Sequence, residues 1–118
     1  MHYIIDIVKT VEVADIAKYI NDCCIGADAV LKWLLPPLRE RYNRDFELKQ
    51  ENWGWYIWFE ESGVKFGVDV HAIDHERGMF QVHVTASNRD MLELARLQEL
   101  VISRLWLWPV AYLIANPM

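Results

Sequence analysis

Apolar side chains recur at every second position between Asp45 and Ser87, and this alternation constrains the fold more than any other feature of the chain. A period of two sends successive side chains to opposite faces of a strand, so it predicts strands with one buried face. Short polar or glycine-containing segments separate the apolar sets, as turns do. The sets are Phe46 and Leu48; Trp53, Trp55, Ile57 and Phe59; Val64, Phe66, Val68, Val70 and Ala72; and Phe80, Val82, Val84 and Ala86. We therefore expect a four-stranded antiparallel meander.

The turn signal Ser62-Gly63 determines how the two central strands pair. A two-residue turn at this point sets Glu61 opposite Val64. A shift by one residue would send every apolar set to the wrong face, so the pattern supports this register. On one face it pairs Phe59 with Phe66, Ile57 with Val68, Trp55 with Val70 and Trp53 with Ala72. On the other face it pairs Glu60 with Lys65, Trp58 with Gly67, Tyr56 with Asp69 and Gly54 with His71.

Parity also restricts the next hairpin, around the loop sequence DHERG. The apolar residues of both its strands have even numbers, so the loop must have an odd length. A five-residue loop would set His71 opposite His83, whereas a three-residue loop would set Asp69 opposite His83. Both alternatives place Asp69, His71 and His83 on the face that carries Tyr56 and Trp58.

The chain ahead of the meander predicts a strand followed by a helix. Residues 2–10 are short and rich in β-branched side chains, which indicates a strand that can join the sheet as a fifth member at its edge. Within residues 13–24, Ile16 and Ile20 recur at helical spacing, and Gly26 lies where a helix would end.

Two further helices are expected. Asp28 can cap the first. Pro36 and Pro37 should kink or break it before one more helical turn, because proline lacks the amide hydrogen and disfavours helical angles in the residue before it. The second is capped within SNRD at 87–90 and ends at Pro109. Its apolar stripe consists of Leu94, Leu97, Val101, Leu105 and Trp108.

These elements predict an α+β fold in which N-terminal helices and a long C-terminal helix cover one face of the meander. A chain of 118 residues has the length of one domain, so we assign 1–118 to a single α+β domain. The net charge of -5 repels phosphate backbones and argues against a nucleic-acid partner. The glycines are scattered rather than gathered in a phosphate-binding loop, and no catalytic motif stands out. We expect no enzymatic activity and no cofactor.

Cys23 and Cys24 are adjacent in the sequence. Neighbouring cysteines close a disulfide only through a strained ring, so the sequence favours two reduced thiols, which are typical of the cytoplasm. The N-terminal stretch carries Asp6 and Glu12 and lacks the basic start of a signal peptide. The longest apolar run, 105–115, is shorter than the roughly 20 residues of a membrane helix. We therefore expect a cytoplasmic location and no membrane partner.

The face opposite the apolar sets gathers aromatic, imidazole and carboxylate side chains, and three interpretations of it stay open. The first is packing alone, because an aromatic ring such as Trp58 commonly covers a cross-strand glycine. The second is protein recognition, because tryptophan and tyrosine beside a few polar groups are typical of interface hot spots. The third is a metal site, because Asp69, His71 and His83 are residue types that hold zinc or non-haem iron.

The leading hypothesis is a small acidic protein-binding module of the adaptor, inhibitor, immunity or chaperone-like kind. Acidic loops would steer it towards a basic protein partner. The expected partner-binding residues are Tyr56, Trp58, Glu60, Glu61, Asp69, His71 and His83. The alternative is a small-ligand or metal-binding protein centred on Asp69, His71 and His83.

The apolar tail at 106–118, WLWPVAYLIANPM, has two interpretations. It can fold back across the sheet as part of the core. It can also form a homodimer interface with the C-terminal helix, because the two together offer more apolar surface than one sheet face can cover. Both interpretations stay open on the sequence alone.

Overall fold

The computed structural model describes residues 2–87, 91–109 and 112–117, and its architecture is α+β, as expected. A six-stranded sheet has the order β2-β3-β4-β5-β1-β6, and every neighbouring pair is antiparallel. The strands are β1 (His2–Val8), β2 (Lys49–Glu51), β3 (Gly54–Glu61), β4 (Val64–Asp74), β5 (Met79–Ala86) and β6 (Tyr112–Pro117). The helices are α1 (Ala27–Tyr42) and α2 (Met91–Trp106), with the short 3-10 helices η1 (Ile16–Lys18) and η2 (His75–Arg77).

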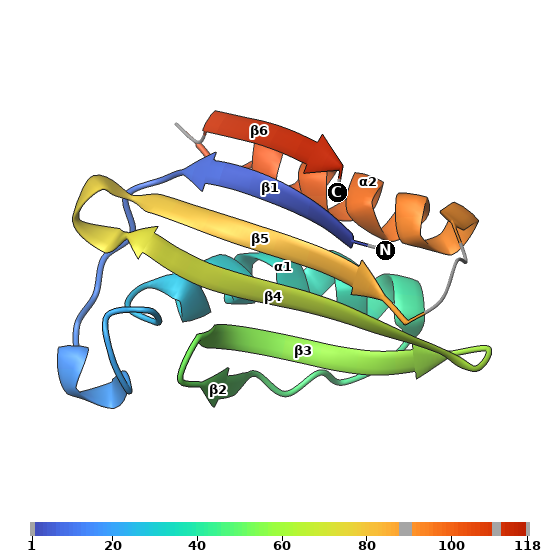
Figure 1. Cartoon of the computed structure of the whole chain (residues 1–118), viewed down its shortest axis with the longest axis horizontal. Coiled ribbons are helices and arrows are strands. Elements are labelled where there is room, and N and C mark those ends of the chain that lie inside the picture. The colour runs from blue at the N-terminus through green and yellow to red at the C-terminus, as the bar shows by residue number, and fades with distance from the viewer. Residues whose placement is uncertain (1, 88–90, 110–111, 118) are drawn as a thin grey trace.

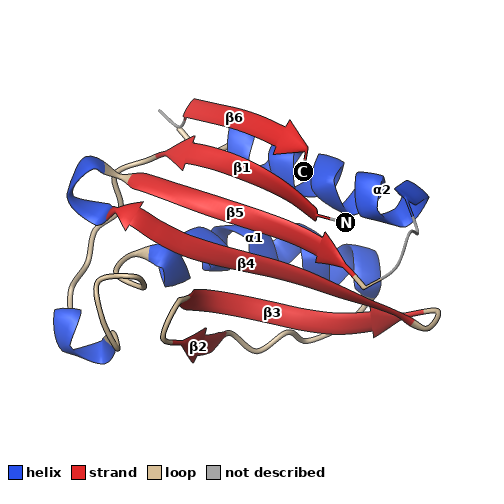
Figure 2. Cartoon of the chain, in the orientation of Figure 1, coloured by secondary structure: helices blue, strands red, loops and turns tan. Residues whose placement is uncertain are grey.

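Both α-helices lie on one side of the sheet, behind the strands in Figure 1. In the described part of the chain no helix crosses the opposite side, which faces the viewer in Figure 2. Ile5, Val68 and Val82 are fully buried between sheet and helices. This confirms that helices cover one face of the sheet. The other face, called the outer face, carries Tyr56, Trp58, Glu60, Lys65, Gly67, Asp69, His71, Gln81, His83 and Thr85.

The central hairpin has the register that its turn predicts. Ser62 and Gly63 adopt φ values of 51° and 81°, the left-handed backbone that a two-residue hairpin turn requires. The observed pairs are Glu61 with Val64, Glu60 with Lys65, Phe59 with Phe66, Trp58 with Gly67, Ile57 with Val68, Tyr56 with Asp69 and Trp55 with Val70.

The expected pairing of Trp53 with Ala72 is wrong. The ladder of the described strands ends at Trp55, and Trp53 lies in the turn between β2 and β3, where Glu51 pairs with Gly54. A turn residue is not bound by the alternation of a strand, so its side chain can reach the other face. The first predicted strand is displaced, because β2 begins at Lys49 and contains neither Phe46 nor Leu48. Phe46 instead packs on Phe59 from outside the sheet, with ring centroids 5.1 Å apart.

The hairpin of β4 and β5 decides between the alternatives that parity left open. Asp69, rather than His71, lies opposite His83, as expected for a three-residue loop. The loop itself is one residue longer, because the last pair joins Asp74 to Met79. A register shift immediately before Asp74 acts as a β-bulge, and its extra residue restores the parity of the apolar sets.

The expected helix at 13–24 is wrong. Only η1 is helical in this segment, and Ile16 and Ile20 are exposed rather than buried. Gly26 does not end a helix there but precedes α1, with a left-handed φ of 80°. The helical spacing of the isoleucines therefore did not report a buried face.

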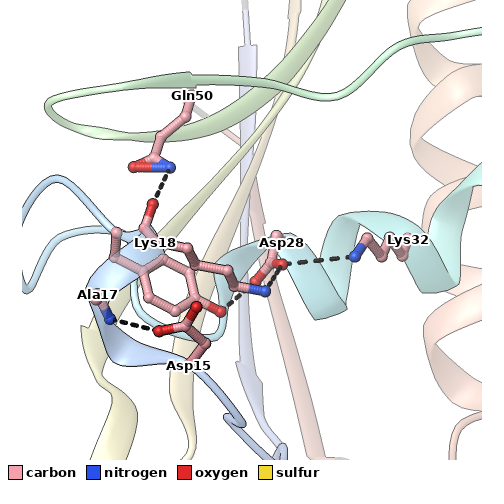
Figure 3. Close-up of polar contacts among 7 residues, drawn as sticks. Asp15, Ala17, Lys18, Asp28, Lys32 and Gln50 are labelled. Atoms are coloured by element: carbon pink, nitrogen blue, oxygen red, sulfur yellow. Dashed lines mark hydrogen bonds and ion pairs between the residues drawn. The ribbon is translucent and has the colours of Figure 1, made fainter.

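Polar contacts hold this segment in an irregular path, as Figure 3 shows. The carboxylate of Asp28, which is 2% exposed, accepts hydrogen bonds from the Tyr19 hydroxyl at 2.6 Å and the Lys18 ammonium at 2.8 Å. Gln50 accepts from the Ile20 backbone N–H at 2.8 Å and donates to the Lys18 carbonyl at 3.2 Å. Asp28 thus lies within the first turn of α1 and anchors the loop, which outweighs the weak helix preference of this stretch.

α1 runs unbroken through Pro36 and Pro37, so of the expected kink or break the structure excludes the break. An interior proline costs a helix about 3 kcal/mol, whereas burying one leucine side chain contributes about 1.5–3 kcal/mol. The helix buries leucines on both sides of the prolines, and this outweighs the local cost. These residues are Leu31, Leu34, Leu35 and Leu38.

α2 confirms the predicted stripe of the C-terminal helix. Leu94, Leu97, Val101 and Leu105 are fully buried. Trp108 packs against the core at the end of the helix and stacks on Trp33, with ring centroids 5.2 Å apart. Of the predicted cap at 87–90, residues 88–90 lie outside the described residues. Among the described helices, none is both long enough and apolar enough to cross a membrane.

The tail adds a strand that the sequence did not predict. Residues 112–117 form β6, which pairs with β1 of the same chain, so this part of the tail folds back as expected, but as a strand. β1 consequently lies between β5 and β6 instead of at the edge of the sheet.

The structure joins Cys23 and Cys24 by a disulfide, so the expectation of two reduced thiols is wrong. The loop directs both side chains towards the turn between β2 and β3. Cys23 Sγ lies 2.8 Å from the Asn52 carbonyl oxygen, and Cys24 Sγ lies 3.2 Å from the Glu51 carbonyl oxygen.

Candidate partner-binding face

Trp58 lies across the outer face because Gly67, its cross-strand neighbour, has no side chain. A Cβ atom on Gly67 would lie 2.9 Å from Trp58 Cδ1 and 2.7 Å from Thr85 Oγ1, which are distances that Cβ atoms do not tolerate. The glycine therefore leaves the space that the indole ring covers. Trp58 is nevertheless 61% exposed, so much of its ring is available to a partner.

The edge of the same ring reaches Asp69. The Trp58 indole Nε1–H donates a hydrogen bond of 2.9 Å to Asp69 Oδ1. Burial raises the pKa of Asp69 from 3.8 to about 6, and the hydrogen bond from Trp58 only partly opposes this. At pH 7 the outer face thus holds a poorly hydrated negative charge beside an exposed tryptophan.

Two histidines adjoin this carboxylate. The rings of His71 and His83 stack, with centroids 4.4 Å apart, and His83 lies directly opposite Asp69. His83 Nε2 is 3.3 Å from Gln81 Oε1. Burial lowers the pKa of His71, and a backbone hydrogen bond with Trp53 opposes this in part. The neutral form of His71 is therefore favoured near pH 7.

Trp53 completes a continuous aromatic cluster. Its ring centroid is 5.2 Å from that of His71, 5.4 Å from that of Tyr56 and 6.4 Å from that of Trp58. The Tyr56 and Trp58 centroids are 4.4 Å apart. Because both indole rings pack on Tyr56, that residue is buried and supports the cluster instead of offering contact area. The aromatic cluster is defined as Trp53, Tyr56, Trp58, His71 and His83.

The structure gathers most of the expected partner-binding residues on the outer face: Tyr56, Trp58, Glu60, Asp69, His71 and His83. Glu60 is exposed there, opposite Lys65. Glu61 is separated from this group, because its side chain alternates to the helix side and forms an ion pair of 2.7 Å with Arg44.

The trio of Asp69, His71 and His83 is close, but in the described structure its side chains are not arranged as a set of metal ligands. No group of three His, Cys, Asp or Glu side chains in the described residues is arranged to hold a metal ion. The imidazole rings lie nearly face to face, 28° from parallel, and Asp69 Oδ1 is engaged by Trp58. A shared metal requires ligand atoms that converge on one point.

Trp53 is the member of the site that the strand pattern missed. Counting by twos assigned it to the core. The local signal was Asn52 before it and Gly54 after it, because both residue types favour turns. Reading this stretch as a turn would have released Trp53 from the alternation.

A hollow of about 510 Å³ adjoins Trp58 at the turn end of the central hairpin. Its lining includes Trp58, Gly67 and Thr85 from the outer face, together with the Glu60 and Lys65 pair. An exposed ring beside a recess is an arrangement into which a partner side chain can fit.

No protein-family model matches the chain, and the search of curated proteins also found no match.

Proposed function

We propose that this chain is a protein-binding module that recognises its partner through the outer face of the sheet. The observation that supports this most is Trp58, which is 61% exposed although its ring packs on Tyr56, with centroids 4.4 Å apart. Large rings held rigidly at a surface lose little conformational freedom on binding, and tryptophan is enriched among interface hot spots. A buried polar group beside the ring adds specificity.

The charge of the chain favours a basic partner. The net charge of -5 attracts positively charged proteins and speeds their encounter at low salt. Inhibitors, immunity proteins, adaptors and chaperones all act by binding a surface of another protein, without catalysing a reaction. We place the module in the cytoplasm as part of the proposal, although the disulfide removes one argument for that location. Cell fractionation tests the location directly.

The test is affinity capture from an extract of the source cells with Trp58→Ala and a matched control. Truncating a hot-spot tryptophan costs about 2 kcal/mol or more, which is about a 30-fold loss of affinity. Ile16 is 61% exposed in η1, which is not part of the sheet, so Ile16→Ala removes an equally exposed apolar side chain elsewhere. Trp58→Ala should lose the partner and Ile16→Ala should retain it. Equal capture by both variants would exclude the outer face.

We also propose that the chain forms a homodimer. The surface proposed for it is smaller than the whole tail. Residues 112–117 already pair with β1, so the exposed apolar side chains of α2 and its end carry the remaining argument. These are Leu92, Trp106 and Leu107. A molar mass of one chain in solution, 13.9 kDa, at high protein concentration would rule the homodimer out.

A further inference from the structure

Asp69 is a partly buried carboxylate without a positive partner in the described part of the chain. Trp58 Nε1 is the one hydrogen-bond donor that the described residues give it, and no ion pair joins it to a described lysine or arginine. Burying a carboxylate without a counter-charge is unfavourable. The other carboxylate held in a buried position, Asp28, shows the usual solution, since Lys18 and Lys32 surround it.

No lysine or arginine of the described structure lies over the rings of Trp53, Tyr56 or Trp58. Described lysines and arginines lie over other rings: Lys9 over Trp108, Lys18 over Tyr19, Arg41 over Tyr42, Arg44 over Phe59 and Arg104 over Trp33. Exposed indole faces attract cations, and tryptophan does so most strongly. Trp58 thus combines an exposed ring with a contact to an unpaired carboxylate.

We propose that the outer face binds an arginine side chain of a partner protein, whose guanidinium pairs with Asp69 and stacks on Trp58. Arginine fits better than lysine, because its planar, weakly hydrated head can stack on a ring and still donate to a carboxylate in its plane. This inference rests on the proposed function and names the group that the face recognises.

The surroundings of Asp69 give the interaction a defined pH dependence. The titratable and charged groups that share the outer face with it are Asp6 from β1, Lys49 and Glu51 from β2, Tyr56 and Glu60 from β3, Lys65 and His71 from β4, and His83 from β5. Asp69 must be ionised to hold a guanidinium, and its pKa of about 6 means that it gains a proton as the pH falls from 7 to 5. Protonation of His71, whose pKa is lowered by burial, would add a positive charge that repels a cation. Both changes weaken binding in acid.

The probe is the peptide acetyl-Gly-Arg-Gly-amide, and its matched control carries neutral citrulline in place of arginine. The readout is the NMR signal of the Trp58 indole N–H, which donates directly to Asp69. One ion pair and one stacking contact correspond to roughly millimolar affinity, so the titration extends to about 50 mM. The arginine peptide should shift the signal saturably at pH 7, and its affinity should fall by about tenfold at pH 5. It should also bind more tightly than the citrulline peptide. Equal responses to both peptides, or no saturable shift, would overturn the inference.

Two variants complete the test. Asp69→Asn keeps an oxygen acceptor for Trp58 but removes the charge, and it should bind the arginine peptide at least about tenfold more weakly. Glu99→Gln removes an exposed charge from α2, outside the outer face, and should bind within about twofold of the wild type. In the capture experiment, loss with Trp58→Ala but retention with Asp69→Asn would overturn the arginine inference alone. Retention with both variants would overturn the proposed function as well.

Discussion

Replacing Asp69 by asparagine should stabilise the protein near neutral pH and leave its stability less dependent on pH. Burial raises the pKa of this carboxyl from 3.8 to about 6, so between these values the folded protein holds a proton that the unfolded chain has released. Stability from this group is therefore fully present below pH 3.8 and is lost as the pH rises through 6. The asparagine side chain of the variant would be neutral throughout and would keep the acceptor for the Trp58 N–H.

The size of the effect follows from the same values. The difference between 3.8 and about 6, at 1.36 kcal/mol for each pKa unit, corresponds to about 3 kcal/mol as an upper limit. Asp69 is only partly buried, so water screens part of this energy. We expect the stability difference between Asp69→Asn and the wild type to increase by about 1–2 kcal/mol from pH 4 to pH 7.5.

Urea unfolding followed by tryptophan fluorescence at several pH values measures this difference. The lowered pKa of His71 acts in the opposite direction in both proteins, so it cancels when the two curves are subtracted. Glu60→Gln is the control, because Glu60 is exposed on the same face and its removal should leave the pH profile unchanged. Wild-type and Asp69→Asn curves that run parallel from pH 4 to pH 7.5 would refute the reasoning.

Three other perturbations test separate parts of the structure. Gly67→Ala should destabilise the protein by about 1–3 kcal/mol, because the new methyl group takes the space of the Trp58 ring. It should also shift the NMR signal of the Trp58 indole N–H, and an unchanged signal would contradict this. Cys23 and Cys24 should resist a maleimide reagent in the unfolded protein until a reductant is added, and mass spectrometry would reveal free thiols if the disulfide is wrong. Asp28→Asn should cost about 1–3 kcal/mol and speed hydrogen exchange at 15–24, whereas unchanged exchange would show that this carboxylate does not anchor the loop.

The sheet was predictable from the sequence where one face is buried and a turn pins the register. The pairs from Glu61 with Val64 to Trp55 with Val70 follow from parity and from Ser62-Gly63. The face that carries Asp69 and His83 follows from the same parity, for either loop length. These predictions succeeded because slipping by one residue would expose every apolar side chain of a strand, which is a large penalty.

Prediction failed where distant contacts decide the local structure. Ile16 and Ile20 have helical spacing. Hydrogen bonds from this segment to Asp28 and Gln50 nevertheless hold its backbone in an irregular conformation. Residues 112–117 form a strand because they pair with β1, which lies at the other end of the sequence. Trp53 was misplaced because alternation was extended past the end of the strand into a turn. Patterns within a short window cannot report such partners.

The outer face and the core are positioned by the same strands, and this explains how an exposed site can be rigid. Asp69 lies between Val68 and Val70, which are both fully buried, so the backbone that carries the carboxylate cannot move without disturbing the core. Its neighbours Gly67 and Trp58 are held by the ladder of β3 and β4. A site with such support presents its groups already in place, so little binding energy is lost in ordering them. Core substitutions that preserve volume at 68 or 70 should therefore leave the proposed recognition intact, whereas those that open a cavity should weaken both stability and the proposed binding.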